Sequence, residues 1–196
     1  MKKLSSKPFL VLVILMAFLV TLSNFLVQYP IYYFDLENLL TYGALSYPAT
    51  FLITDLANRR YGKIIARKIV YVGFFLGISL TLFLSTNFSD ILSIRIAIGS
   101  GTAFLLAQLL DVQIFDKLRK KVWFLAPFAS STIGSLVDTF LFFSIAFYGT
   151  NLNWFTLAIG DFCIKILLAL ILLVPFRLLM SRLQDVTKYG IKISSV

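Results

Sequence analysis

The chain has 196 residues, of which 59% are hydrophobic and only 14% are charged, and its formal net charge is +9. A soluble domain has roughly 45–50% apolar and about 25% charged residues, so this composition excludes a soluble globular enzyme, a disordered chain and a disulfide-built secreted domain. Because the chain has no histidine and a single cysteine, Cys163, we expect no metal site and no cofactor.

Six apolar runs are each long enough to cross a hydrocarbon core of ~30 Å as an α-helix. They cover residues of about 9–27, 39–57, 69–84, 91–114, 122–148 and 155–179, and the third can also start near Ile64. The first run has no small-residue cleavage site before Tyr29-Pro30, so we interpret it as a membrane span. The sequence therefore predicts an all-α integral membrane protein with a single transmembrane domain over residues 1–196.

Basic residues gather at alternate ends of these runs. All Lys and Arg residues except Arg95 and Lys165 lie at the N-terminus, in the loops after the second and fourth runs, or in the tail. Cytoplasmic loops carry the excess of Lys and Arg, so we expect six transmembrane helices with both termini in the cytoplasm, in an inner or plasma membrane. This orientation explains the positive charge without nucleic acid, and the same residues would contact anionic membrane lipid.

The second run contains a proline and ends in polar residues. Pro48 removes a backbone donor and predicts a kink. Asp55 and Asn58 lie one turn apart near the cytoplasmic end, where an inner gate and a cap for the basic loop are equally good interpretations. In the third run Gly73 and Gly77 form a G-x-x-x-G pattern, which indicates close helix packing.

The fourth run carries polar residues at helical spacing. Gly101, Phe104, Gln108 and Asp111 are three or four residues apart and so share one helix face. Polar and ionisable side chains are costly inside a membrane, and those that a chain retains are candidates for function. For Asp111 the alternative is a position at the cytoplasmic interface, where a charge costs little.

The fifth run has the clearest polar face, made of Ser131, Gly134, Ser135, Asp138 and Phe142. Helix packing accounts for the small residues, because they let helices approach closely. It does not account for a carboxylate, so Asp138 is a candidate functional residue.

The sixth run contains Asp161 and Lys165, which are four residues apart on one helix face. One interpretation is a mutually neutralising ion pair that lowers the cost of insertion. The other is a switch in which a substrate or a proton competes for one partner.

The predicted inward-facing groups suit a flat heterocycle. Carboxylate and amide oxygens accept the N–H donors of a purine-like edge, and aromatic rings stack on its face. The carboxylates are spread over four runs, which fits a metal ion less well. No nucleophile–base pair stands out, so we do not expect an enzyme.

Several segments in this order resemble the queuosine precursor transporter family, also called the vitamin uptake transporter family. The similar segments are Tyr47–Asp55 with Asn58 and Tyr61–Lys63, Ala103–Val112 with Phe115, Ser130-Ser131, Asp138–Phe143, and Lys165 followed by Pro175. The resemblance covers roughly residues 40–180. It implies six helices and uptake of 7-deazaguanine bases for queuosine in tRNA: 7-cyano-7-deazaguanine, 7-aminomethyl-7-deazaguanine or queuine.

Together, the residues and the resemblance predict a secondary transporter for such a base. The expected substrate-binding residues are Phe104, Gln108, Asp111, Ser131, Asp138 and Phe142, and the expected coupling or gating residues are Asp55, Asn58, Asp161 and Lys165. A substrate-binding subunit that needs a separate ATPase module, as in energy-coupling-factor vitamin transporters, is the alternative. An intramembrane enzyme and a purely structural protein are further alternatives, and a homodimer stays open.

Overall fold

The computed structural model describes residues 6–26, 29, 31–32, 41–85, 91–151 and 153–182. Its helices are α1 (Ser6–Leu26), α2 (Tyr42–Ser46), α3 (Pro48–Tyr61), α4 (Lys63–Ser85), α5 (Ile91–Leu118), α6 (Leu125–Phe147) and α7 (Trp154–Arg182). No β-strand forms among these residues, which confirms the predicted all-α fold for them. Lys2, Lys3, Lys188 and Lys192, which contributed to the predicted orientation, lie outside the described part of the chain.

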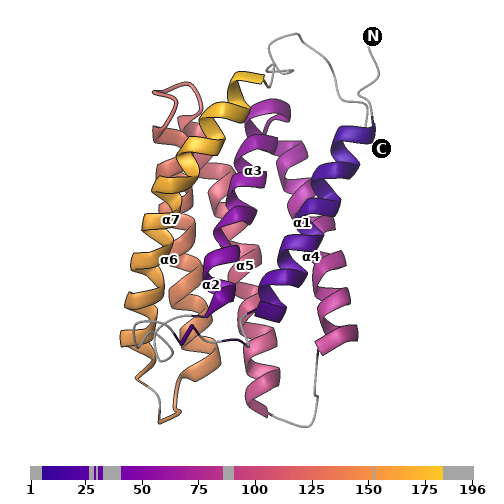
Figure 1. The fold of residues 1–196 in the computed structure, drawn as a ribbon. Coiled ribbons are helices and arrows are strands. Elements are labelled where there is room, and N and C mark those ends of the chain that lie inside the picture. Colours follow the sequence, from indigo (N-terminus) through magenta and orange to yellow (C-terminus); the bar gives the residue numbers. More distant parts are fainter. Residues whose placement is uncertain are drawn as a thin grey trace.

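The helices form one bundle with α3 at its centre (Figure 1). α3 contacts every other helix of the described chain, while α1 packs along α4 and α5 packs along α6. In Figure 1, α1 and α4 lie on one side of α3, and α6 and α7 lie on the other. The beginning of α1 and the end of α7 lie at the same end of the bundle.

The second predicted span is interrupted at its proline. α2 ends at Ser46, and α3 begins with Pro48 in its first turn. The missing N–H of proline costs no hydrogen bond at a helix start, so the predicted kink occurs as a junction between two helices.

The second and third spans are not separated by a basic loop, and the alternative start of the third span near Ile64 is confirmed. α3 continues to Tyr61 and α4 already begins at Lys63, so Gly62 alone joins them. Gly62 has a φ of 81°, a backbone conformation that glycine adopts without the steric cost that other residues incur. Hydropathy placed the helix ends where the charge begins, but Lys and Arg are good helix formers, and the basic residues extend both helices.

α5 and α7 extend beyond the predicted limits of their apolar runs, whereas α6 is shorter than its run at both ends. α5 reaches Leu118, past the predicted end at residue 114, and α7 reaches Arg182, past the predicted end at residue 179. α6 begins at Leu125, because Trp123 and Phe124 form a turn.

Four of the helices are long and apolar enough to cross a membrane by themselves. These stretches are Phe9–Leu26, Ile94–Leu118, Leu125–Phe147 and Trp154–Met180. Large apolar side chains point outward on several helices, for example Leu10, Phe75 and Ile171. Such an exposed apolar surface suits lipid rather than water.

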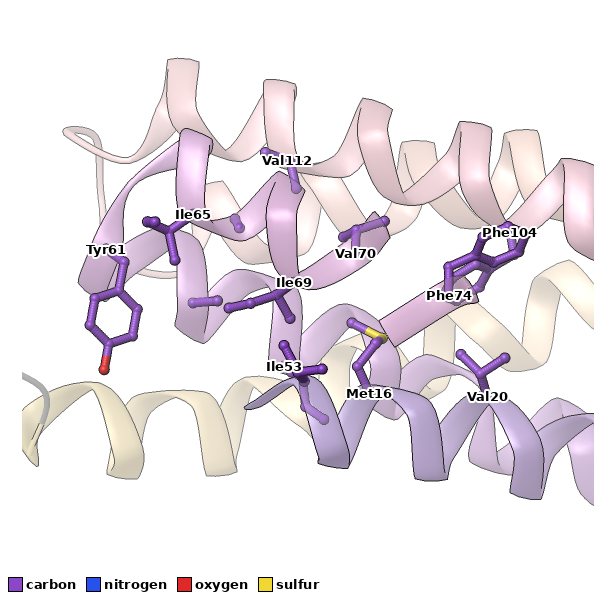
Figure 2. Packing of buried hydrophobic residues seen from close by; sticks show 13 residues of the cluster. Met16, Val20, Ile53, Tyr61, Ile65, Ile69, Val70, Phe74, Phe104 and Val112 are labelled. Carbon is purple, nitrogen blue, oxygen red and sulfur yellow. The ribbon is translucent and has the colours of Figure 1, made fainter. Parts of the chain in front are cut away.

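One half of the core lies between α1, α3, α4 and α5 (Figure 2). Figure 2 shows Met16 and Val20 of α1 beside Ile69 and Phe74 of α4. A Cβ atom added at Gly77 would lie 2.8 Å from Val20 Cβ, which is closer than such atoms approach. The predicted packing role of the G-x-x-x-G pattern is therefore confirmed for the α1–α4 contact.

The end of the bundle where α3 finishes is basic, and contacts from α3 and α4 to the end of α5 and to Arg119, just after it, hold it together. The Arg59 guanidinium donates to the Arg119 carbonyl oxygen at 2.6 Å, and the Arg119 guanidinium donates to the Arg59 carbonyl oxygen at 2.9 Å. Lys63 forms an ion pair with Asp116 at 3.3 Å. At the other end, Arg95 donates to the carbonyl oxygen of Ile145. It therefore binds the last turn of α6.

Candidate functional site

Gln108 of α5 is bound to two threonines of α3. Thr54 Oγ1 donates to Gln108 Oε1 at 2.6 Å, and Gln108 Nε2 donates to Thr50 Oγ1 at 2.8 Å. All three side chains are buried. Polar contacts of this kind hold helices together where water is absent, so in this structure Gln108 joins α3 to α5.

One turn further along, Asn58 Nδ2 donates to the Val112 carbonyl oxygen at 2.8 Å. The pairs Thr54–Gln108 and Asn58–Val112 have the same sequence offset, so α3 and α5 run parallel in fixed register. Asp55 of α3 and Asp111 of α5 lie between these two pairs. Their carboxyl groups are near enough for their charges to interact.

This carboxyl pair, Asp55 and Asp111, is deeply buried. Asp55 is 2% exposed and Asp111 is 0% exposed. Ser130 and Ser131 of α6 donate to the two oxygens of Asp55 at 3.2 and 3.4 Å. Neither oxygen of Asp111 accepts a hydrogen bond from the described residues. Asp111 therefore lies inside the bundle and not on its surface.

A second buried polar cluster joins α6 to α7 and consists of Asp138, Thr139, Asp161 and Lys165. Lys165 Nζ lies 2.9 Å from Asp138 Oδ2 and 2.7 Å from Asp161 Oδ2. It also donates to Thr139 Oγ1 at 2.9 Å, and Thr139 donates to Asp161 at 2.7 Å. The three hydrogens of the ammonium group are therefore all used. With every group ionised, this cluster carries one net negative charge.

A narrow cleft lies between α3, α6 and α7 and reaches both polar groups. Its lining residues are Pro48, Phe51, Leu52, Asp55, Pro127, Ser131, Ser135, Lys165, Ala169, Leu172, Leu173 and Phe176. Asp55 and Lys165 thus face one shared space, with Asp111 beside the first and Asp138 and Asp161 beside the second. The cleft has room for about one water molecule.

The structure brings together some of the expected site residues and separates others. Ser131, Asp55 and Lys165 line the cleft. Phe104 does not, because its ring stacks on Phe74 at 5.7 Å and meets the edge of Tyr47.

The remaining expected residues also lie outside the cleft lining. The Phe142 ring is half-buried and packs against Phe143 and Phe147. Asn58 and Gln108 are used in contacts between α3 and α5.

Sequence reasoning missed several residues of this region. Ser135 was on the predicted polar face of its helix, but it was not assigned to the site. Thr139 follows Asp138 directly, and a hydroxyl beside a membrane carboxylate is a signal that could have found it. The Tyr47 ring lies 5.6 Å from Lys165 Nζ. Phe51 and Phe176 gave no signal, because apolar residues are ordinary in membrane helices.

A bundle of apolar helices with a polar cleft and buried charged side chains is the architecture of a membrane transporter. Ionisable residues inside membrane helices typically mark substrate or ion pathways. The comparisons below place the chain within this class.

The chain belongs to the queuosine precursor transporter family. The family model described as "Putative vitamin uptake transporter" matches residues 41–180. A protein of Haemophilus influenzae named "Probable queuosine precursor transporter" is 36% identical, over 81% of this chain and 80% of its own. The "Queuosine precursor transporter" of Escherichia coli is 33% identical over 85% of each chain.

A further relative, the "Probable queuosine precursor transporter" of Bacillus subtilis, is 31% identical over 67% of each chain. No solved structure was found to match the chain. The family and the apolar helices together identify a multi-pass membrane transporter, and the resemblance in the sequence is thereby confirmed.

Proposed function

We propose that this protein imports a 7-deazaguanine precursor of queuosine across the inner or plasma membrane. The names of three relatives support this class of cargo. The observation that carries the proposal is the buried Asp55 carboxyl at the cleft, which accepts a hydrogen bond from Ser131; Ser135 lines the same cleft.

The chemistry of the cleft suits a guanine-like edge. Such a base presents two neighbouring N–H donors, one on the ring and one on the exocyclic amine, and a carboxylate can accept both. Hydrogen bonds to a charged group are stronger than those between neutral groups. Phe51 and Phe176 line the same cleft and can contact the flat face of the base. We therefore centre base recognition on Asp55 and Ser131.

The other expected residues take supporting roles in this proposal. Asp111 acts through Asp55, while Gln108 and Asn58 hold α3 against α5. Asp138, Asp161 and Lys165 join α6 to α7, so they are suited to gate the cleft. The 7-cyano, 7-aminomethyl and queuine forms share the same edge, so all three remain candidate cargoes.

We propose six membrane crossings with both chain ends in the cytoplasm. α2 with α3 forms the second crossing and α4 forms the third. The basic contacts at the end of α3 support a cytoplasmic location for that end of the bundle.

The test is uptake of labelled 7-cyano-7-deazaguanine by cells that cannot synthesise queuosine. Cells that express the chain are expected to accumulate the label and restore queuosine in tRNA, and cells without it are not. The same uptake into lipid vesicles that contain only this protein would support a secondary transporter without a separate ATPase module. Absence of uptake in both systems would contradict the proposal.

A further inference from the structure

We propose that the carboxyl pair Asp55–Asp111 binds and carries a proton, and that this proton is coupled to movement of the base. The transport half of the inference rests on the proposed function. The proton site itself rests only on the arrangement of these two side chains between α3, α5 and α6.

Both carboxyl groups of the pair are buried inside the bundle. Two carboxylates in direct proximity repel each other, and the burial of even one charge away from water is costly. Asp55 and Asp111 are 2% and 0% exposed, and both lie between the Thr54–Gln108 and Asn58–Val112 contacts that join α3 to α5. A single proton held between them removes one charge and supplies a donor. Pairs of carboxyls in contact share a proton in this way.

A second observation concerns the carboxyl oxygens of Asp111. Asp111 Oδ1 and Oδ2 accept no hydrogen bond from the described residues, although both are fully buried. Buried polar atoms are nearly always hydrogen-bonded. A proton on one carboxyl would give the other the donor that it lacks.

Among the described groups that face the carboxyl pair, no cation is available to compensate a second negative charge. α6 presents two hydroxyls there, Ser130 and Ser131. α7 presents Lys165, which is bound by Asp138 and Asp161.

Three cations on α3 and α4 have partners away from the carboxyl pair. Arg59 of α3 binds a carbonyl oxygen of Arg119. On α4, Lys63 pairs with Asp116 and Arg67 donates to Gln113 near the surface.

The coupling follows from the position of Asp55, which faces both Asp111 and the cleft. When the N–H donors of a base bind Asp55, the carboxylate form of Asp55 is favoured and the shared proton moves to Asp111. The base and the proton can then cross together, and release of the proton on the cytoplasmic side leaves the pair with its second negative charge. No bond other than O–H is made or broken.

The proton site can be tested without any transport. In the infrared spectrum of the purified protein at neutral pH, we expect the C=O band of a protonated buried carboxylic acid. The double variant Asp55→Asn/Asp111→Asn is expected to lose this band, and Asp116→Asn, at the surface ion pair, is expected to keep it. Absence of the band from the unmodified protein, or its persistence in the double variant, would overturn the proposal.

Coupling is tested in vesicles with labelled 7-cyano-7-deazaguanine. With one coupled proton, an inward gradient of one pH unit is expected to accumulate the base about tenfold. Asp111→Asn should lose this accumulation and keep exchange of labelled for unlabelled base. Accumulation that follows a Na⁺ gradient and ignores the pH gradient would overturn the coupling. If the infrared band behaves as expected but no base enters the vesicles, the proposed function fails and the proton site stands. If the base enters but the band is absent, the proton site fails and the proposed function stands.

Discussion

Lys165 is a buried cation that contacts two carboxylates. Its side chain is 6% exposed, and its ammonium group binds two carboxylates and a threonine hydroxyl on two helices. Removal of one member of a buried ionic group leaves uncompensated charge, which costs far more than loss of an exposed pair.

We predict that Lys165→Met lowers the free energy of unfolding by about 3–5 kcal/mol, because Asp138 and Asp161 lose their cation. The matched control is Lys63→Met, whose side chain is 54% exposed in its pair with Asp116. This control should cost about 0–1 kcal/mol. Thermal unfolding of the detergent-purified variants measures both, and equal melting temperatures would contradict the assigned role of Lys165.

Gln108 allows a second test at this scale, because its contacts here are between helices. Gln108→Leu leaves Thr50 and Thr54 bonded to backbone carbonyl oxygens of their own helix. We therefore expect a stability loss of about 1 kcal/mol and little change in the affinity for the base, measured by binding of labelled base. Loss of binding without loss of stability would instead place Gln108 in the binding site.

Between elements, the α1–α4 contact depends on the absence of side chains at Gly73 and Gly77. We predict that Gly77→Ala destabilises the protein by about 1–3 kcal/mol through overpacking against Val20. Val20→Ala in the same chain should recover part of this loss. At Gly101 a Cβ would meet Phe74 at an ordinary distance of 3.7 Å, so Gly101→Ala serves as the tolerated control. Equal melting temperatures for the two glycine variants would be inconsistent with this packing.

Periodicity predicted the elements and their polar faces, and it could not predict which faces meet. The four-residue spacing of Asp161 and Lys165 indicated an ion pair, and the structure confirms it. The contact of Ser131 with Asp55 joins residues 76 positions apart, and nothing local to either one specifies the other. Likewise, the amide of Gln108 was predicted to face a ligand, but in the structure it is bonded to two threonines of α3.

For the molecule as a whole, the cleft is too narrow in this structure to hold a base. Admission of a ligand requires α3, α6 and α7 to separate at the residues that line it. The ion-pair cluster between α6 and α7 and the bonds from Ser130 and Ser131 to Asp55 resist this opening. A bound base therefore has to favour the open arrangement by its own contacts.

Orientation is a further property of the whole molecule. In a chain that carries Cys163→Ser, the added substitution Lys120→Cys places a thiol at an exposed position. This thiol should react with a membrane-impermeant reagent only from the cytoplasmic side. A cysteine at exposed Asn151, at the other end of α6, should react only from outside. Reaction of both from the same side would contradict the proposed six crossings.

Asp55 is the residue that we propose to recognise the edge of the base, and binding to the purified protein is a direct test of this role. The dissociation constant for labelled 7-cyano-7-deazaguanine is measured for the unmodified chain, for Asp55→Asn and for the surface control Asp116→Asn. We predict that Asp55→Asn weakens binding at least about tenfold, equivalent to about 1.4 kcal/mol, and that Asp116→Asn leaves the dissociation constant unchanged. Equal affinities for the unmodified chain and Asp55→Asn would contradict this role.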